Sequence, residues 1–172
     1  MDTKTRDRRQ FLKTLTGAAL LGLAGTSGLP GRLLAQENSG NLDWSSLSKA
    51  QWRERLSAEE FEILREEGTE PAFSSPLNAE TRKGTYVCAG CALPLFSSET
   101  KFESGTGWPS FYQPLPDAVD TKTDFKLLFP RTEYHCRRCG GHQGHVFDDG
   151  PEPTGKRWCN NGLALDFKPD ET

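Results

Sequence analysis

The sequence predicts an all-β domain with a short N-terminal helix, folded as an antiparallel sandwich or small barrel and stapled by four cysteines. Beyond residue 84, short β-prone runs alternate with Gly, Pro, Ser and Asp, which is typical of strands joined by tight turns. The chain contains 17 Gly and 11 Pro, a content that favours many turns. Two Cys-x-x-Cys pairs lie far apart in the sequence, so a shared metal ion would tie distant loops together.

Six segments have the composition expected of strands. They are residues 85–87, 93–96, 125–129, 134–135, 145–147 and 163–167. The last segment alternates, so Leu163, Leu165 and Phe167 are expected to share one face of a strand.

One segment before the strands has the signals of a helix. Ser57 and Glu60 have the spacing of a capping box, in which each side chain bonds the backbone N–H of the other residue. Gly68 is a natural stop, because glycine readily adopts the left-handed conformation that ends helices. The sequence therefore predicts a helix over residues 57–67.

The N-terminal segment resembles an export signal of the twin-arginine type. Arg8 and Arg9 are followed by Gln-Phe-Leu-Lys and then by an apolar stretch rich in Gly and Ala. We expect residues 1–35 to direct export to the periplasm, 36–43 to be a flexible linker, 44–168 to form the domain and 169–172 to be a tail. An uncleaved membrane tether stays open, because Leu33 fits poorly at the −3 position of a cleavage site after Ala35.

The charge of the chain is unevenly distributed. The net charge is −3, but residues 1–35 contribute six basic and two acidic side chains, so the remainder carries −7. Binding to nucleic acid requires basic side chains that neutralise phosphates, so the acidic body argues against such a partner. The remaining length of about 137 residues is that of one domain. Nothing in the pattern indicates an obligate dimer, and a monomer is expected.

Four of the five cysteines form the two Cys-x-x-Cys pairs. Cys88 with Cys91 and Cys136 with Cys139 supply four thiolates, which suit a closed, structural zinc site with one ion. Redox disulfides are the alternative, and export to an oxidising compartment favours them. However, a thioredoxin-type pair opens a helix, whereas residues 92–96 read as a turn and a strand. Zinc is therefore the preferred interpretation.

The fifth cysteine, Cys159, is a candidate nucleophile. Arg157 is two residues upstream and would project to the same face of a strand, where its charge would lower the pKa of the thiol. A buried structural cysteine is the alternative. His142 and His145 could donate protons to a reacting oxygen, although such a pair is also common in purely structural roles. Trp108 could line a small apolar pocket or belong to the core.

Four motifs occur together and in the order found in one known family. They are Gly-Thr-Tyr-Val-Cys-x-x-Cys at 84–91, the run from Lys101 to Phe111, Cys-x-x-Cys-Gly-Gly-His-x-Gly-His-Val-Phe-x-Asp-Gly-Pro at 136–151, and Pro-Thr-Gly-Lys-Arg-Trp-Cys-Asn-Asn at 153–161. In these motifs the chain resembles the B-type methionine sulfoxide reductases over residues 44–168. A β-rich fold with a structural four-cysteine zinc is what the resemblance implies.

The resemblance also implies a reaction. The substrate would be the R epimer of methionine sulfoxide, free or in proteins. Cys159 would attack the sulfoxide sulfur and become a sulfenic acid, while His142 and His145 would organise protons around the departing oxygen. The remaining matched positions would bind the substrate or shape the pocket: Trp108, Phe147, Asp149, Arg157 and Asn161.

Two positions depart from the family pattern. Thr106 stands where many members carry a resolving cysteine, and with four cysteines assigned to zinc no other thiol is left for that role. We therefore predict a cycle with one cysteine, completed by a thioredoxin-like protein or a small thiol. Trp158 stands where tyrosine or phenylalanine is usual, which changes packing only. A zinc-stapled binding module without catalysis is the competing hypothesis, and it has no use for Cys159 beside Arg157.

Overall fold

The computed structural model describes residues 42–126 and 129–171. The predicted export signal at 1–35 and almost all of the predicted linker lie outside the described residues. In the described part of the chain, no helix is both long enough and apolar enough to cross a membrane.

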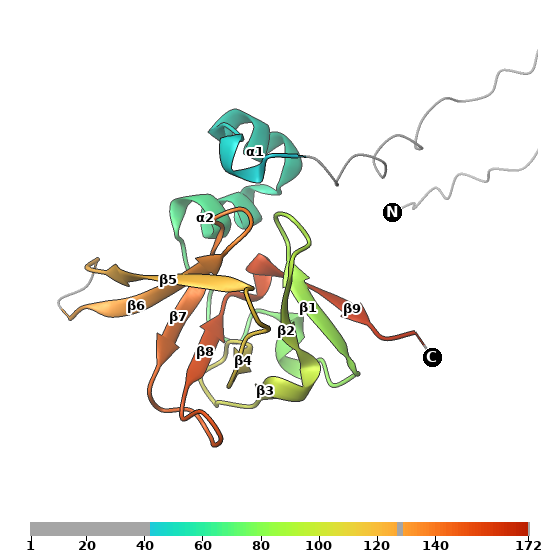
Figure 1. The fold of residues 1–172 in the computed structure, drawn as a ribbon, viewed down its shortest axis with the longest axis vertical. Helices are drawn as coiled ribbons and strands as arrows, with labels where there is room; N and C mark the ends of the chain where they lie inside the picture. Colours follow the sequence, from blue (N-terminus) through green and yellow to red (C-terminus); the bar gives the residue numbers. More distant parts are fainter. Residues whose placement is uncertain (1–41, 127–128, 172) are drawn as a thin grey trace, which may run out of the picture. The chain divides into compact units, whose positions relative to one another are not determined.

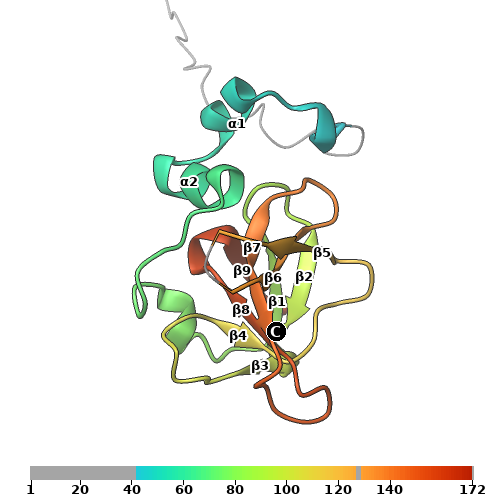
Figure 2. The ribbon, with the colours of Figure 1, turned by 90° about the vertical axis from the view of Figure 1, so that its left-hand side faces the viewer.

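Two short helices precede the strands. Helix α2 (Ala58–Glu66) is the predicted helix, and both hydrogen bonds of its capping box are present between Ser57 and Glu60. Its left-handed terminal residue is Glu67, with φ 56°, and not Gly68 as predicted. Helix α1 (Lys49–Arg55) was not predicted, although Ser48 and Gln51 form the same kind of capping box. Figure 2 shows both helices at one end of the strands.

The strands form two antiparallel sheets (Figure 1), which confirms the predicted fold class. The smaller sheet has the order β2-β1-β9. Its strands are β1 (Gly84–Cys88), β2 (Pro94–Ser97) and β9 (Leu165–Pro169). The larger sheet has the order β3-β4-β8-β7-β6-β5. Its strands are β3 (Lys101–Phe102), β4 (Ser110–Phe111), β5 (Val119–Asp124), β6 (Arg131–Cys136), β7 (His142–Phe147) and β8 (Arg157–Asn160).

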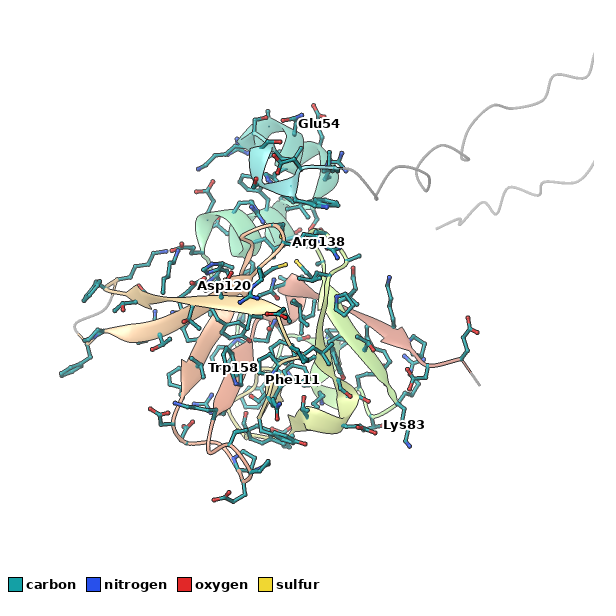
Figure 3. All side chains as sticks on the ribbon, in the orientation of Figure 1. Glu54, Lys83, Phe111, Asp120, Arg138 and Trp158 are labelled. Carbon is teal, nitrogen blue, oxygen red and sulfur yellow. The ribbon has the colours of Figure 1, made fainter. Side chains whose placement is uncertain are left out.

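Aromatic side chains from both sheets form the core. Phe96 of β2 stacks on Phe111 of β4 with ring centroids 4.2 Å apart, and Tyr134 of β6 meets Phe96 edge-on at 6.1 Å. Trp158 packs edge-on against Tyr134 at 5.0 Å. In Figure 3 the labelled Phe111 and Trp158 lie in the middle of the strands. The core therefore holds β8, the strand that carries Cys159, against the smaller sheet.

The predicted strand at 125–129 is wrong. Phe125 and Phe129 lie outside the strands with 77% and 76% of their surface exposed, and residues 127–128 are outside the described residues. The strand is instead the polar segment Val119–Asp124, which pairs with β6 over its whole length. Because β5 is the edge of its sheet, the backbone ladder forms without an apolar run.

The last strand begins later than predicted. Leu163 belongs to a 3₁₀ turn, η4 (Gly162–Ala164), and is 38% exposed, so it does not share a strand face with Leu165 and Phe167. The cause is Glu70, whose carboxylate accepts hydrogen bonds from the backbone N–H groups of Gly162 (2.6 Å) and Leu163 (2.9 Å). These bonds hold the turn where strand pairing would otherwise begin.

Candidate active site

Cys159 lies at the centre of the larger sheet. It is paired in register with His145 of β7 on one side and with Ser110 of β4 on the other. Arg157 precedes it by two residues on β8, so both side chains lie on the same face of the strand, as predicted. The thiol is neither fully buried nor fully exposed.

A cavity of about 130 Å³ opens beside this thiol. It contains five of the predicted site residues, namely Trp108, His145, Phe147, Cys159 and Asn161, together with Thr69, Arg131, Gly144 and Asn160. Asp149, Arg157 and His142 are predicted site residues that do not line it. The pairing of β7 with β8 thus brings together residues from the two C-terminal motifs, and Trp108 joins them from the segment before β4.

Contrary to the prediction from the sequence, Arg157 does not lower the pKa of the Cys159 thiol below its usual value. The pKa of the Cys159 thiol is raised, because burial outweighs the opposing effects of Arg157 and of a hydrogen bond from Thr106. The guanidinium is also engaged elsewhere: Nε and one terminal nitrogen each donate to Asp149 at 2.9 Å. Its cationic group lies 4.4 Å from the centroid of the Phe147 ring. The prediction of a net lowered thiol pKa is therefore wrong.

His145 is held by a carboxylate that the sequence did not suggest. Its Nε2 lies 2.7 Å from Oδ2 of Asp124, which also accepts from Arg131 at 2.7 Å. Burial lowers the pKa of His145, and the hydrogen bond to Asp124 acts in the opposite direction. Asp124 therefore occupies the Nε2 atom of the His145 ring.

His142 is buried behind His145, with the two ring centroids 5.5 Å apart. Its Nδ1 lies 2.6 Å from Oε1 of Glu133, while Oε2 of the same carboxylate lies 3.0 Å from Nδ1 of His135. Burial by itself raises the pKa of Glu133, but the hydrogen bonds to the two histidines prevail and lower it to about 2. Nε2 of His142 is buried and has no hydrogen-bond partner among the described residues.

Glu70 fixes two walls of the cavity and was not recognised from the sequence. Its backbone carbonyl accepts from Nε1 of Trp108 (3.1 Å), and its backbone N–H donates to Oδ1 of Asn161 (3.1 Å). Glu70 is 4% exposed, and its carboxylate caps the turn that follows Asn161. A lone acidic residue before a proline gives no signal by itself, because its partners are more than 30 residues away.

A chain of hydroxyl groups leads to the thiol. Ser104 Oγ lies 2.8 Å from Thr106 Oγ1 and 2.9 Å from Ser110 Oγ. The hydrogen bond between Thr106 and the Cys159 thiol is one of the effects that oppose burial. Thr106 therefore lies within contact distance of the thiol that a resolving cysteine would have to reach.

The four paired cysteines come together at the end of the strands near the helices. All four are buried, and their sulfur atoms lie within 4.8 Å of one another. Cys88 and Cys139 are 3.7 Å apart and Cys91 and Cys136 are 3.5 Å apart, close to the edge of about 3.8 Å in a tetrahedron with Zn–S bonds of about 2.3 Å. A disulfide requires about 2.05 Å, so none is formed.

Two arginine side chains donate hydrogen bonds to the cysteine cluster, and their positive charge suits thiolates. Arg65 of α2 donates to the carbonyl of Cys139 at 3.0 Å and to its sulfur at 3.4 Å. Arg138, labelled in Figure 3, donates to the carbonyl of Cys91 at 3.1 Å. Gly140 has a φ of 66°, the left-handed turn predicted after the second pair. The cluster could therefore hold one metal ion.

Comparison with known proteins points to one family. The family model described as the SelR domain matches residues 56–169. The chain is 53% identical to the peptide methionine sulfoxide reductase MsrB of Leptospira interrogans, over 70% of this chain and 93% of that protein. The corresponding proteins of Methanosarcina barkeri (51% identical, 72% of this chain and 88% of that protein) and Agrobacterium fabrum (52%, 71% and 91%) are similar to it.

The chain belongs to the B-type methionine sulfoxide reductase family. It is an oxidoreductase that reduces methionine sulfoxide, and a binding module without catalysis is not supported. Cys159 lines the small cavity together with Trp108 and His145.

Proposed function

We propose that this protein reduces the R epimer of methionine sulfoxide through Cys159. The observation that carries the proposal is the position of the Cys159 thiol in the wall of a cavity of about 130 Å³, directly opposite His145 in the β7–β8 pairing. A cavity of this size suits one side chain, since sites for larger ligands start at roughly 300 Å³. Trp108 and Phe147 provide apolar surface for the methyl group of the substrate.

The proposed chemical step transfers one oxygen atom. The sulfur of Cys159 attacks the sulfoxide sulfur, the S–O bond of the substrate breaks, and the oxygen ends on Cys159 as a sulfenic acid. The thiol is oxidised by two electrons and the sulfoxide is reduced to the thioether, so the equation balances without another reactant. The departing oxygen must be protonated during the step, which requires an acid beside it.

We assign the protonation to the histidine pair. His145 lines the cavity next to the thiol, and in its imidazolium form, with Nε2–H on Asp124, its Nδ1–H could donate directly or through a water molecule. His142 lies behind it and is oriented by the buried carboxylate of Glu133. Asp149, Arg157 and Asn161 are assigned to shaping the pocket: the ion pair fixes the Phe147 wall, and Asn161 is held by Glu70.

The sulfenic acid is proposed to be reduced from outside the protein. Thr106 contacts Cys159 where a resolving cysteine would act, and the other four thiols gather in the buried cluster. Two equivalents of an external thiol would regenerate Cys159 and release water and one disulfide. A thioredoxin-like protein or a small thiol would serve as this reductant.

We propose that the metal is zinc and that its role is structural. Four sulfur ligands close a tetrahedral site and leave no open position, so the zinc would add stability without taking part in the reaction. We also propose that residues 1–35 direct export by the twin-arginine route, which carries folded proteins and would allow zinc loading beforehand. The domain is expected to act as a monomer in the periplasm.

A single turnover tests the chemistry. The reduced protein is mixed with one equivalent of an R-sulfoxide peptide without reductant, trapped with dimedone, and mapped by mass spectrometry. One adduct on Cys159 is expected. In Thr106→Cys, a disulfide between residues 106 and 159 should replace the adduct. A disulfide in the unmodified protein would contradict the cycle with one cysteine.

A further inference from the structure

Some of the exposed apolar side chains of the described residues lie close in the sequence to residues that line or support the cavity. Four large ones are exposed: Phe73, Phe125, Phe129 and Leu163. Phe125 follows Asp124, which holds His145, and Leu163 lies two residues beyond Asn161 of the cavity wall. Phe73 bonds to the residue before Trp108. Water-exposed aromatic rings beside a binding pocket often mark a contact surface for a partner molecule.

Phe73 is the most unusual of the four. Its φ is 65°, a left-handed conformation that is a genuine outlier for a bulky residue. Its backbone N–H donates to the carbonyl of Gly107 at 2.7 Å, which holds this conformation. The ring nevertheless remains 73% exposed. The backbone is thus held in a strained state that presents an aromatic ring to solvent.

The position of this ring is tied to the substrate pocket. A Cβ atom at Gly107 would lie 2.8 Å from the Phe73 ring, so the ring rests on the residue that precedes Trp108. Asn78 also donates to the carbonyl of Gly107, at 2.9 Å, which fixes this contact. Trp108 is in turn bonded to the carbonyl of Glu70, three residues before Phe73. Phe73 does not line the cavity itself, but its ring rests on the residue next to Trp108, which does.

We propose that Phe73 selects polypeptide substrates in which apolar residues flank the oxidised methionine. The inference rests on the proposed function. The cavity of about 130 Å³ takes one side chain, so the neighbouring residues of a polypeptide must lie on the rim. There an apolar neighbour would cover the exposed ring and remove both surfaces from water. Free methionine sulfoxide has no neighbours and gains nothing from Phe73.

A structural role for the ring would require more burial. Only about a quarter of its surface is covered, and Gly107 provides that contact. Glycine is the residue that a left-handed backbone accepts most readily, so Phe73→Gly removes the ring without straining the loop. The substitution therefore separates substrate contact from folding.

The test compares three R-sulfoxide substrates: Gly-Leu-Met(O)-Leu-Gly, Gly-Gly-Met(O)-Gly-Gly and the free amino acid. For the unmodified enzyme, KM is expected to be lowest for the Leu-flanked peptide. In Phe73→Gly, that KM should rise about tenfold with kcat unchanged, while the other two substrates keep their kinetic constants. Phe73→Tyr, which keeps the ring, should restore the low KM.

Two outcomes would overturn the inference. Equal KM values for the two peptides with the unmodified enzyme would do so without any variant. A parallel loss with all three substrates in Phe73→Gly would show that the ring only supports the pocket. Failure of the proposed function looks different, since no sulfoxide of any length would then be reduced.

Discussion

His145 of β7 and Cys159 of β8 are direct partners in the antiparallel ladder, and both side chains line the same small cavity. The pairing sets the distance between a candidate acid and a candidate nucleophile through backbone hydrogen bonds, so it does not depend on a flexible loop. On the far side of His145, Asp124 of the edge strand β5 binds Nε2 at 2.7 Å. The position and hydrogen bonding of His145 therefore depend on three strands, β5, β7 and β8.

The Asp124 contact predicts a shift in the pH dependence. Asp124 raises the pKa of His145 against the effect of burial, so Asp124→Asn should lower that pKa. If His145 acts as an acid, activity is lost as pH rises through its pKa, and the falling limb of kcat/KM against pH should move to lower pH. Asp120→Asn is the control: it removes another carboxylate of β5, one that is bound to Arg137, and it should leave the limb in place. An unmoved limb in Asp124→Asn would exclude His145 as the acid.

The ion pair between Arg157 and Asp149 predicts how the thiol responds to mutation. Asp149 disfavours the thiolate of Cys159 and Arg157 favours it, so Asp149→Asn should lower the raised pKa of the thiol. The pH profile of alkylation by iodoacetamide reports this pKa, and its midpoint should move to lower pH. Asp148→Asn is the matched control, because Asp148 is exposed and pairs with Lys156. Identical midpoints for Asp149→Asn and the unmodified protein would contradict the account.

Glu70 is predicted to position the pocket without touching the reacting atoms. In Glu70→Ala, the N–H groups of Gly162 and Leu163 lose their partner, at a cost of about 1–3 kcal/mol in the free energy of unfolding. The backbone bonds of residue 70 to Trp108 and Asn161 are kept, but the turn that follows Asn161 loses its cap. The Asn161 wall should therefore loosen, and KM for a sulfoxide peptide should rise more than kcat falls.

Glu60→Ala provides the comparison for Glu70. It removes one hydrogen bond of the capping box of α2, and Glu60 does not line the cavity. Glu70→Gln keeps one acceptor oxygen and should recover part of the KM. If Glu60→Ala changed KM as much as Glu70→Ala, the effect would come from lost stability alone.

The cysteine cluster predicts separate consequences for zinc and for catalysis. Cys91→Ser should lower the zinc content measured by elemental analysis and lower Tm, because binding at a structural site contributes on the order of 10 kcal/mol to folding. Cys159→Ser should keep one zinc per chain and an unchanged Tm. Retention of full zinc content by Cys91→Ser would contradict the assigned ligand set.

The sequence predicted the parts of the site that are local. The Cys-x-x-Cys spacing, the left-handed Gly140 and the capping box of α2 each depend on residues a few positions apart, and all are present. The two misjudged strands depend on distant partners. The apolar run at 125–129 looked like a strand, but pairing with β6 selects the polar segment before it.

The carboxylates that hold the site residues in place were likewise not predictable from the sequence. Glu70, Asp124 and Glu133 are buried carboxylates whose partners lie far along the chain or in neighbouring strands. Their residue type gives no hint of this, since most acidic side chains are exposed. The net effect on the Cys159 thiol also depends on burial, which the sequence motif around Arg157 does not reveal.

Turnover of the two separated epimers of a methionine sulfoxide peptide, with dithiothreitol as reductant, tests the central claim most directly. The account predicts reduction of the R epimer alone, and complete loss of this activity in Cys159→Ser with zinc content and Tm retained. Reduction of the S epimer, or undiminished activity in Cys159→Ser, would contradict it.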